Sequence, residues 1–430
     1  MRRVLLAAIA SVAATAIAAT AAAHPPVGIA PHAPRTTPKG EPEPLVTSWL
    51  DDARARLAAD KLDGWLLADW QGENPVAGDV VRPRGPSHRW FYLVTATGQP
   101  QLLCHADDAA AFDVRKPLVY RTWRELEAQL KVLLRGRRRV AMEWSPRDPA
   151  LSRVDGGTID LVRAAGAVPV SSGDLVTMMR ARWTDAQLAT HRAAAAALAA
   201  VKDEVFAAIA HGGGRLTEYD EQQRAWKALA AHGLEAADPP IVAAGVHTAD
   251  PGFAPSPERS ERIAPGDLVL FSAAARVRGV RDAVYADLTW VGFVGDHVPD
   301  EMQHLYAIAR DARSAVLALV AARLKKKQAV RGFELDDAAR AVAAKAGFGD
   351  RVLRPTGHAL DTRRFGEGPT FDDATTHDDR QLLPRTGYVV EPGLYVAGAF
   401  GVRVAADLYL GADGLHTTPE TPQQEIELIR

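Results

Sequence analysis

Three residues in the second half of the chain have side chains of the types that bind divalent metals, and each lies in or beside a strand-like run. Asp287 lies in ADLTW at 286–290, His358 ends the turn TGH at 356–358, and Glu391 follows the apolar run 388–390. Carboxylate oxygen and imidazole nitrogen are common ligands of Zn²⁺ and Mn²⁺ in proteins. The pattern therefore predicts a metal site built on a sheet, with these three residues as its ligands.

The charges of this set suit one metal ion. Two carboxylates balance one divalent cation, and three protein ligands with a water molecule are the usual form of a mononuclear catalytic site. The alternative is a metal-free site, because two buried carboxylates need a positive partner and an arginine can provide it. Arg363 is the first candidate for that partner and Arg403 the second. Both alternatives stay open: one divalent ion (Mn²⁺, Zn²⁺ or Co²⁺), or none.

The motifs around these residues resemble those of a known group of enzymes. TGH at 356–358, EPGLY at 391–395 and GVR at 401–403 have the order and approximate spacing of the motifs in aminopeptidase P, prolidase, methionine aminopeptidase and creatinase. The resemblance covers the chain from about residue 180 to its end, and the preceding region more weakly resembles the N-terminal domain of aminopeptidase P and creatinase. It implies the pita-bread fold and a peptide substrate with proline in the second position.

The resemblance also implies two metals held by five side chains, and two of those positions are altered. Ser272 stands where an Asp is expected after GDLVLF, and Ala405 stands where a Glu is expected after GVR and one further residue. A methyl group cannot bind a metal, and a neutral hydroxyl is a poor ligand. The sequence therefore predicts that the second metal position is empty.

Two histidines that act in catalysis in this family are also replaced. Their positions fall on Gly252 and Phe365, neither of which has a side-chain hydrogen-bond donor. Loss of one such donor to the transition state costs about 3 kcal/mol of barrier. His247 is the nearest possible substitute, although a loop histidine is the simpler interpretation. Peptidase activity is therefore expected to be weak or lost.

Asp407 is the remaining carboxylate near the altered Glu position. It shares the parity of Ala405 on the expected strand 401–410 but lies roughly 7 Å farther along. We therefore do not expect it to replace the missing ligand.

The chain is expected to have four parts. Residues 1–23 have Arg2-Arg3, an Ala-rich core and a small-residue end, which indicate a cleaved export signal. Residues 24–45 form a Pro-rich linker. An α/β domain is expected over 46–178, because strand-like and helical patterns alternate there. Over 179–430 helices are expected to cover a curved antiparallel sheet. The expected fold class is therefore α/β (α+β).

The periodicity and the capping signals locate the main elements of the second part. Helices are expected over 184–212, 217–232, 301–327 and 335–345, and strands over 267–275, 283–294, 387–391 and 401–410.

The amino-acid composition limits the possible binding partners and the cellular compartment of the protein. The net charge is −2, which provides no basic field for nucleic acid, and 47% of the residues are hydrophobic. The only cysteine is Cys104, expected to be a buried, inert thiol, so no intramolecular disulfide can form. We expect an exported protein, periplasmic or secreted, without a membrane span after processing; the family resemblance adds a homodimer as a further expectation.

Three functions are compatible with these observations. The first is an exported aminopeptidase P-like metallopeptidase with at most one metal. The second is a pseudopeptidase that binds peptides or another ligand in the old cleft, and the third is a structural or partner-binding protein. Bound metal and turnover distinguish the first from the others, and peptide affinity without turnover distinguishes the second from the third.

Overall fold

The computed structural model describes residues 45–430. The predicted export signal, residues 1–23, and the predicted linker up to residue 44 lie outside the described residues. Residues Thr47–Arg430 form one compact unit. The predicted domain boundary after residue 178 falls within helix α5 (Gly173–Arg180) and stays a prediction.

A six-stranded sheet forms the first part of this unit, in the order β4-β3-β2-β1-β5-β6. Strand β1 pairs in parallel with β5 and antiparallel with β2. The strands are β1 (Gly64–Asp69), β2 (Trp90–Val94), β3 (Gln101–His105), β4 (Leu118–Tyr120), β5 (Arg139–Met142) and β6 (Val168–Ser171). The helices around them are α1 (Leu45–Ala59), α2 (Pro75–Val81), α3 (Trp123–Leu133), α4 (Gly156–Ala164) and α5, with the 3₁₀ turns η1 (Ala106–Ala111) and η2 (Pro149–Leu151).

Side-chain alternation explains why helices cover both faces of this sheet. Trp65 and Leu67 of β1 pack in a cluster with residues of α1, α2 and α5. Leu66, between them, packs in a second cluster with residues of α3 and α4. Successive strand residues point to opposite faces, so a strand that is apolar throughout needs cover on both sides. The expected α/β arrangement of this region is confirmed, and Cys104 is buried as predicted.

The remaining residues form three further sheets. Their helices are α6 (Asp185–Gly212), α7 (Glu218–Ala231), α8 (Asp300–Lys325) and α9 (Gly332–Lys345), with the 3₁₀ turns η3 (Gly245–Ala249) and η4 (Gly349–Arg351). The strands are β7 (Leu234–Glu235), β8 (Ile241–Ala244), β9 (Leu268–Val277), β10 (Ala286–Val294), β11 (Gly357–Leu360), β12 (Thr370–Phe371), β13 (Gly387–Val390), β14 (Gly393–Val396), β15 (Phe400–Arg403), β16 (Ala406–Leu410), β17 (Leu415–Thr418) and β18 (Glu427–Ile429).

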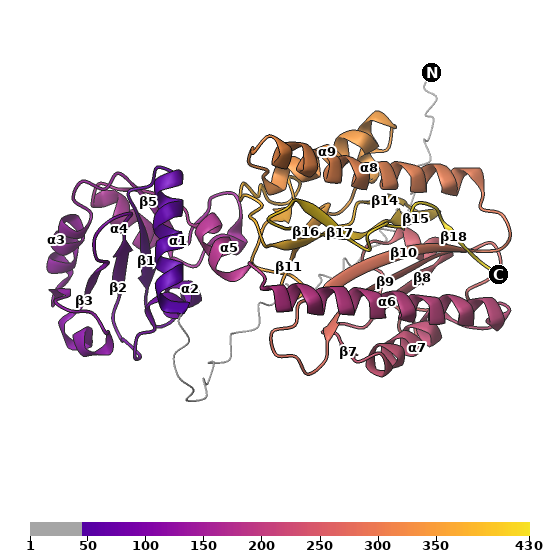
Figure 1. The fold of residues 1–430 in the computed structure, drawn as a ribbon, viewed down its shortest axis with the longest axis horizontal. Coiled ribbons are helices and arrows are strands. Elements are labelled where there is room, and N and C mark those ends of the chain that lie inside the picture. Colours follow the sequence, from indigo (N-terminus) through magenta and orange to yellow (C-terminus); the bar gives the residue numbers. More distant parts are fainter. Residues whose placement is uncertain (1–44) are drawn as a thin grey trace, which may run out of the picture. The chain divides into compact units, whose positions relative to one another are not determined.

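Helices α6 and α7 pack on one face of the sheet β18-β10-β9-β7 (Figure 1). The capping box predicted at the start of α6 is present, between Thr184 and Gln187. Phe271, Ala286 and Leu288 face these helices within a single apolar cluster. Asp287 lies between the last two on β10, so alternation turns its side chain to the other face.

Helices α8 and α9 pack on the sheet β12-β11-β13-β16-β17 (Figure 1). Ala359, Tyr388 and Leu408 of its central strands face these helices. Their strand neighbours point to the opposite face, toward Asp287. Both sheets therefore present a helix-covered face and a second face, and the candidate site lies where the second faces meet.

The strand expected over 401–410 is two strands in the structure. Strand β15 pairs with β14, whereas β16 pairs with β13 and β17. Residues Val404 and Ala405 separate them and belong to neither ladder. The prediction of one continuous strand was wrong, because the mostly apolar pattern of 401–410 does not mark the change of partner.

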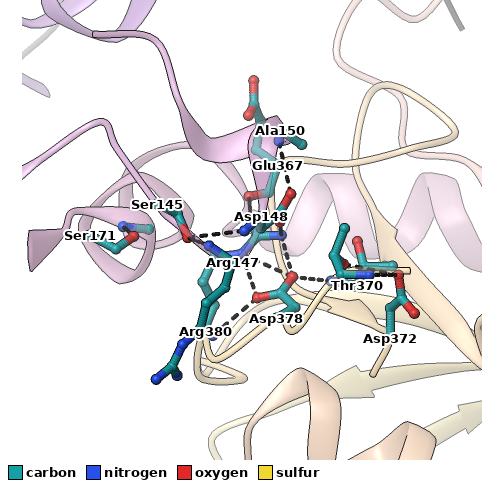
Figure 2. Close-up of polar contacts among 12 residues, drawn as sticks. Ser145, Arg147, Asp148, Ala150, Ser171, Glu367, Thr370, Asp372, Asp378 and Arg380 are labelled. Atoms are coloured by element: carbon teal, nitrogen blue, oxygen red, sulfur yellow. Dashed lines mark hydrogen bonds and ion pairs between the residues drawn. The ribbon is translucent and has the colours of Figure 1, made fainter. Parts of the chain in front are cut away.

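Arg380 holds together segments that are far apart in sequence (Figure 2). Its Nε and Nη2 atoms donate to Asp378 at 3.0 and 2.6 Å, and Nη1 donates to the carbonyl of Glu367 at 2.8 Å. Asp148 lies 4.0 Å from Nη2. Thr370 donates its backbone N–H to Asp378 at 2.7 Å. The loop after β5 is thereby fixed against the segment 367–380.

Candidate functional site

Asp287 is the most deeply buried of the predicted ligands. It lies on β10 opposite Ala274 of β9, and its side chain is fully buried. Its Oδ2 atom accepts a hydrogen bond from Arg364, while Oδ1 has no partner. A buried carboxylate of this kind is stable only beside a positive group.

His358 and Glu391 lie beside Asp287, as the sequence predicts. His358 is on β11, and Glu391 directly follows β13. The Nε2 atom of His358 is 3.8 Å from Asp287 Oδ2 and 3.8 Å from Glu391 Oε1. Its Nδ1 atom is 3.0 Å from the carbonyl of Ala359, which requires Nδ1 to carry the proton. The Nε2 atom has no hydrogen-bond partner and faces the two carboxylates. The role of the three residues as metal ligands stays a prediction.

The altered ligand positions carry no additional carboxylate. Ser272 is buried, and its hydroxyl accepts a hydrogen bond from the Thr289 hydroxyl at 3.0 Å. Ala405 is buried in an apolar cluster that contains Trp183 and Val389. Neither residue offers an anionic ligand for a second metal ion.

The altered histidine positions also lack donors. Gly252 uses its backbone N–H to bind Asp250 at 2.8 Å. Phe365 is 57% exposed, and its ring lies 4.5 Å from the His358 ring, centroid to centroid. An apolar ring therefore stands beside the candidate ligands.

Arg364, rather than the predicted Arg363, is the cation at this site. Its Nε atom donates to Asp287 Oδ2 at 2.8 Å, and a second contact of 3.7 Å reaches Asp238. The negative charge of Asp287 raises the pKa of Arg364 despite burial. Arg363 instead contacts Glu367 at 2.8 Å. The prediction used the strand parity that Arg363 shares with Phe365, but β11 ends at Leu360 and residues 361–365 are not in a strand, so parity does not hold there.

Arg403 supplies a second positive charge. Its Nε atom lies 3.6 Å from Glu391 Oε2. Burial would lower the pKa of Arg403, but the Glu391 carboxylate outweighs this effect and raises it. Each predicted carboxylate ligand therefore faces its own guanidinium.

Asp407 is much closer to the site than the sequence argument allowed. Its Oδ2 atom accepts the backbone N–H of Asp287 at 3.0 Å. We expected Asp407 on one continuous strand with Ala405, but the break between β15 and β16 makes that expectation wrong. Burial, with the charge of Asp287 nearby, raises the pKa of Asp407 well above its usual range. The neutral, protonated form is favoured as a result.

His191 is a residue that the sequence analysis missed. It lies on α6, with Nδ1 2.9 Å from the carbonyl of Tyr285 and Nε2 3.8 Å from Asp407 Oδ2. Burial lowers its pKa to about 4. Its only sequence signal is a histidine in an otherwise Ala-rich helix, which does not indicate what the helix faces.

His247 is fixed near the site but outside the ligand group. Its Nδ1 atom is 2.8 Å from Glu218 Oε2, and its ring stacks on Phe253 at 4.2 Å. His247 and Arg403 line the same small cavity, of about 20 Å³. His247 is thus anchored by a buried carboxylate and is not a simple surface histidine.

The charge balance tests whether these residues fit a divalent metal. The carboxylate of Asp287 lies 2.8 Å from the Arg364 guanidinium, and the carboxylate of Glu391 lies 3.6 Å from that of Arg403, so two negative charges face two positive ones. A divalent ion would add two uncompensated positive charges to a buried site, which is strongly unfavourable. Within residues 45–430, no three His, Cys, Asp or Glu side chains form a metal-binding group. The residues present do not fit a divalent metal ion.

The comparisons with known proteins agree with the fold and the motifs. The model of metallopeptidase family M24 matches residues 189–412, just over half of the chain. The chain belongs to metallopeptidase family M24. The "Probable dipeptidase PepE" of Mycobacterium tuberculosis is 25% identical over 268 residues, which are 62% of this chain and 66% of that protein. The Xaa-Pro dipeptidase of Lactobacillus helveticus is 28% identical over 189 residues, 44% of this chain and 46% of that protein.

These matches leave part of each relative uncovered: the chain spans just under two thirds of the PepE relative and less than half of the Xaa-Pro dipeptidase. Solved structures of M24 type cover more. The dipeptidase PepE from Mycobacterium ulcerans has a TM-score of 0.59 at 21% identity, over 89% of this chain and 98% of that one. The X-Pro aminopeptidase from Thermotoga maritima has a TM-score of 0.53 at 19% identity, over 88% and 99%. The expected fold class, an α/β region followed by a pita-bread region, is confirmed.

Proposed function

We propose that this M24 protein binds peptides in the family cleft and does not cleave them by metal-dependent hydrolysis. The observation that carries the proposal is the hydrogen bond from Arg364 Nε to Asp287 Oδ2. The guanidinium provides the positive charge that a metal would otherwise provide. This favours a pseudopeptidase over the one-metal Xaa-Pro aminopeptidase-like enzyme that the sequence also allows.

The altered ligand and histidine positions support the same proposal. Two-metal hydrolysis needs one metal to activate water and both to stabilise the transition-state oxygen. Ser272 and Ala405 leave no bridging carboxylate for a second metal. Gly252 and Phe365 provide no side-chain donor for the developing oxyanion, and each lost donor raises the barrier by about 3 kcal/mol.

The surface beside the site suits an apolar peptide residue. Phe365 is 57% exposed, next to His358. A flat aromatic ring offers a large contact area to a proline ring or an aliphatic side chain. The unpartnered Nε2 atom of His358 can form a hydrogen bond with the ligand. A peptide with an apolar residue is therefore the ligand class that we propose.

The second candidate is a one-metal peptidase, and one specific observation favours it. Asp287 Oδ1, His358 Nε2 and Glu391 Oε2 are buried and have no hydrogen-bond partner. These are metal-ligand atoms, and unpartnered buried acceptors are unusual. If Arg364 moved away from Asp287, these atoms would become available to one ion.

Metal content and turnover together test the proposal. The protein lacking residues 1–23 is incubated with Mn²⁺, Zn²⁺ or Co²⁺, desalted and measured by elemental mass spectrometry beside a His358→Ala control. We expect equal, near-zero metal in both, no cleavage of Xaa-Pro peptides, and peptide binding by calorimetry. About one metal per chain, lost in the control and accompanied by metal-dependent cleavage, would establish the one-metal peptidase. Absence of both binding and turnover would point to a partner-binding protein.

Export and dimerisation are further parts of the proposal. The Arg-Arg start and Ala-rich core of residues 1–23 support export, and the family resemblance supports a homodimer. Within residues 45–430, none of the helices has the length and apolar character needed to cross a membrane. Cell fractionation of a tagged full-length chain, with light scattering of the purified protein, tests both parts.

A further inference from the structure

We propose that the protein has a second binding site, for a neutral saccharide, at the carboxyl ends of β1 and β5 in its first sheet. The residues that line this site lie within 68–73 and 152–158. The family cleft is built from other segments of the chain, so the saccharide site is independent of the proposed function.

The order of the strands creates a crevice at this end of the sheet. Strands β1 and β5 are parallel neighbours. The chain leaves β1 through α2 toward β2 on one side, and it leaves β5 through α4 toward β6 on the other side (Figure 1). Helices α2 and α4 also pack on opposite faces of the sheet. In open α/β sheets, ligands bind beyond the carboxyl ends of strands whose connections diverge in this way.

A cavity of about 530 Å³ lies at this point of the sheet. One wall is the end of β1 with the loop that follows it, and the other is the segment that leads from β5 into α4. Binding sites for small organic molecules have volumes of about 300–1,000 Å³. The cavity therefore has the size of a site for a small organic ligand.

Buried polar contacts hold the wall after β1 in place. Glu143, directly after β5, is buried and accepts hydrogen bonds from Trp65 at 2.6 Å and from Asn74 at 2.7 Å. Asp69 accepts the backbone N–H groups of Gly72 at 3.1 Å and Asn74 at 2.8 Å. The loop after β1 is thereby tied to itself and to the end of β5. A preformed wall of this kind lowers the entropy cost of binding a ligand.

Trp70 places an aromatic surface on this wall. It lines the cavity and is 50% exposed. The Arg89 guanidinium lies 5.8 Å from the centre of a Trp70 ring, and Arg89 Nη2 lies 3.8 Å from Asp155 on the opposite wall. Arg89 therefore contacts both walls and helps to fix the indole in one orientation. A fixed, exposed indole offers a flat apolar surface for the C–H face of a sugar ring.

The polar side chains around the cavity suit a ligand with several hydroxyl groups. Gln71, Glu73 and Arg153 line it with an amide, a carboxylate and a guanidinium. Arg153 donates to the carbonyl of Ser152 at 3.2 Å and keeps further N–H donors for a ligand. A hydroxyl group can donate to a carboxylate and accept from a guanidinium. A saccharide combines such hydroxyl groups with the apolar face that Trp70 would contact.

The charges of the lining favour a neutral ligand. The carboxylates of Asp69, Glu73 and Asp155 line the cavity beside the guanidinium of Arg153, and like charges placed together oppose binding of a nucleotide or a phosphorylated sugar. Asp69 and Asp155 already accept backbone N–H groups, at 2.8 and 2.9 Å, so a cationic ligand is not needed to satisfy them. A neutral saccharide is therefore favoured over both charged classes.

Saturation-transfer NMR of the purified protein with maltose, cellobiose or diacetylchitobiose tests this site. We expect at least one of these disaccharides to bind, Trp70→Ala to weaken its Kd about tenfold, and Trp70→Phe, which keeps an aromatic ring, to retain most of the affinity. Trp123→Ala is the matched control, because Trp123 is 56% exposed on α3, outside the lining of the cavity. The control should leave the Kd unchanged.

Charged probes and one further variant distinguish a neutral ligand from a charged one. Glu73→Gln keeps a hydrogen-bond acceptor without the charge, so saccharide binding should persist. Adenosine monophosphate and benzylamine serve as the anionic and cationic probes. Binding of no disaccharide, equal weakening by Trp70→Ala and Trp123→Ala, or tighter binding of either charged probe would overturn the proposal. Because these measurements use neither peptide nor metal, such a failure would leave the proposed function standing.

Discussion

Arg380 and Arg364 each pair with a buried aspartate, but the two pairs differ in how completely they are satisfied. Arg380 binds both oxygens of Asp378 and the carbonyl of Glu367 (Figure 2). Arg364 binds one oxygen of Asp287, while the other oxygen has no partner. Neither Arg380 nor Asp378 has a buried side-chain atom without a partner.

The difference distinguishes a structural ion pair from the ligand site that we propose. In the Arg380 pair, backbone N–H groups and a second carboxylate, Asp148, complete the surroundings of both charges. Buried polar groups in structural positions are normally satisfied in this way. Around Arg364, unpartnered acceptors remain on Asp287, His358 and Glu391. These unpartnered atoms are consistent with the ligand site that we propose and not with a purely structural ion pair.

Breaking the satisfied pair should have the largest effect on stability. Arg380→Met keeps much of the side-chain volume but leaves Asp378, which is fully buried, without its counter-charge. Breaking a buried ion pair on one side costs about 3–5 kcal/mol. Urea unfolding followed by circular dichroism measures this loss.

The control for Arg380 is an exposed pair in the same region. Arg147 lies 3.3 Å from Asp379, and both side chains are exposed to solvent. Arg147→Met should cost less than about 1 kcal/mol. Similar losses for the two variants would contradict the distinction between a structural pair and a surface pair.

The next largest effect should be the pH dependence of stability that His191 causes, beside Asp407. The pKa of His191 is lowered from 6.5 to about 4 by burial, so the unfolded chain binds a proton more readily than the folded protein between these values. The contribution of His191 to the stability of the folded protein is therefore complete above pH 6.5 and is lost as the pH falls toward 4. The difference corresponds to about 3 kcal/mol.

His191→Gln tests this assignment because glutamine does not titrate. The variant should lose less stability than the wild type between pH 6.5 and 4, measured by urea unfolding at a series of pH values. Parallel curves for the two proteins would show that other groups cause the acid loss.

The smallest effect should be a gain of stability at Asp407. Its pKa is raised by burial and by Asp287, so the folded protein holds a proton that the unfolded chain releases near its usual pKa of 3.8. The contribution of this proton to folding stability is complete below the pKa that Asp407 has in the unfolded chain, and it is lost as the pH rises. Asp407→Asn keeps an acceptor for the Asp287 N–H without the titration, and should stabilise the protein by roughly 1 kcal/mol at pH 8 but not at pH 3.5.

Asp372 provides the control, because its pKa is lowered whereas that of Asp407 is raised. Hydrogen bonds from Thr375 and Ala374 outweigh burial and lower its pKa. Asp372→Asn should therefore destabilise the protein at pH 8, by about 1–2 kcal/mol. Destabilisation by both substitutions would mean that Asp407 is ionised in the folded protein.

Local patterns were sufficient to predict much of the fold. The Thr184 capping box, the apolar periodicity of α8 and the alternation in the first part all appear in the structure, because each depends on neighbours within one or two turns or strands. The prediction of a single strand over 401–410 was wrong because its pairing depends on strands that are distant in the sequence. Its two halves pair with different strands, and no residue within it records that change.

The sequence alone indicated three of the groups at the site and four positions that lack the groups expected from the family motifs. It identified Asp287, His358 and Glu391 as neighbours, and Ser272, Ala405, Gly252 and Phe365 as positions without the expected ligands or donors, because motif order fixes residue types. Only the tertiary structure decided which charges meet. Arg364 in place of Arg363, Asp407 beside Asp287, and His191 from α6 depend on a turn after β11, a break between strands and the packing of a distant helix. Such contacts depend on side-chain direction across sheets, which the linear spacing of residues does not encode.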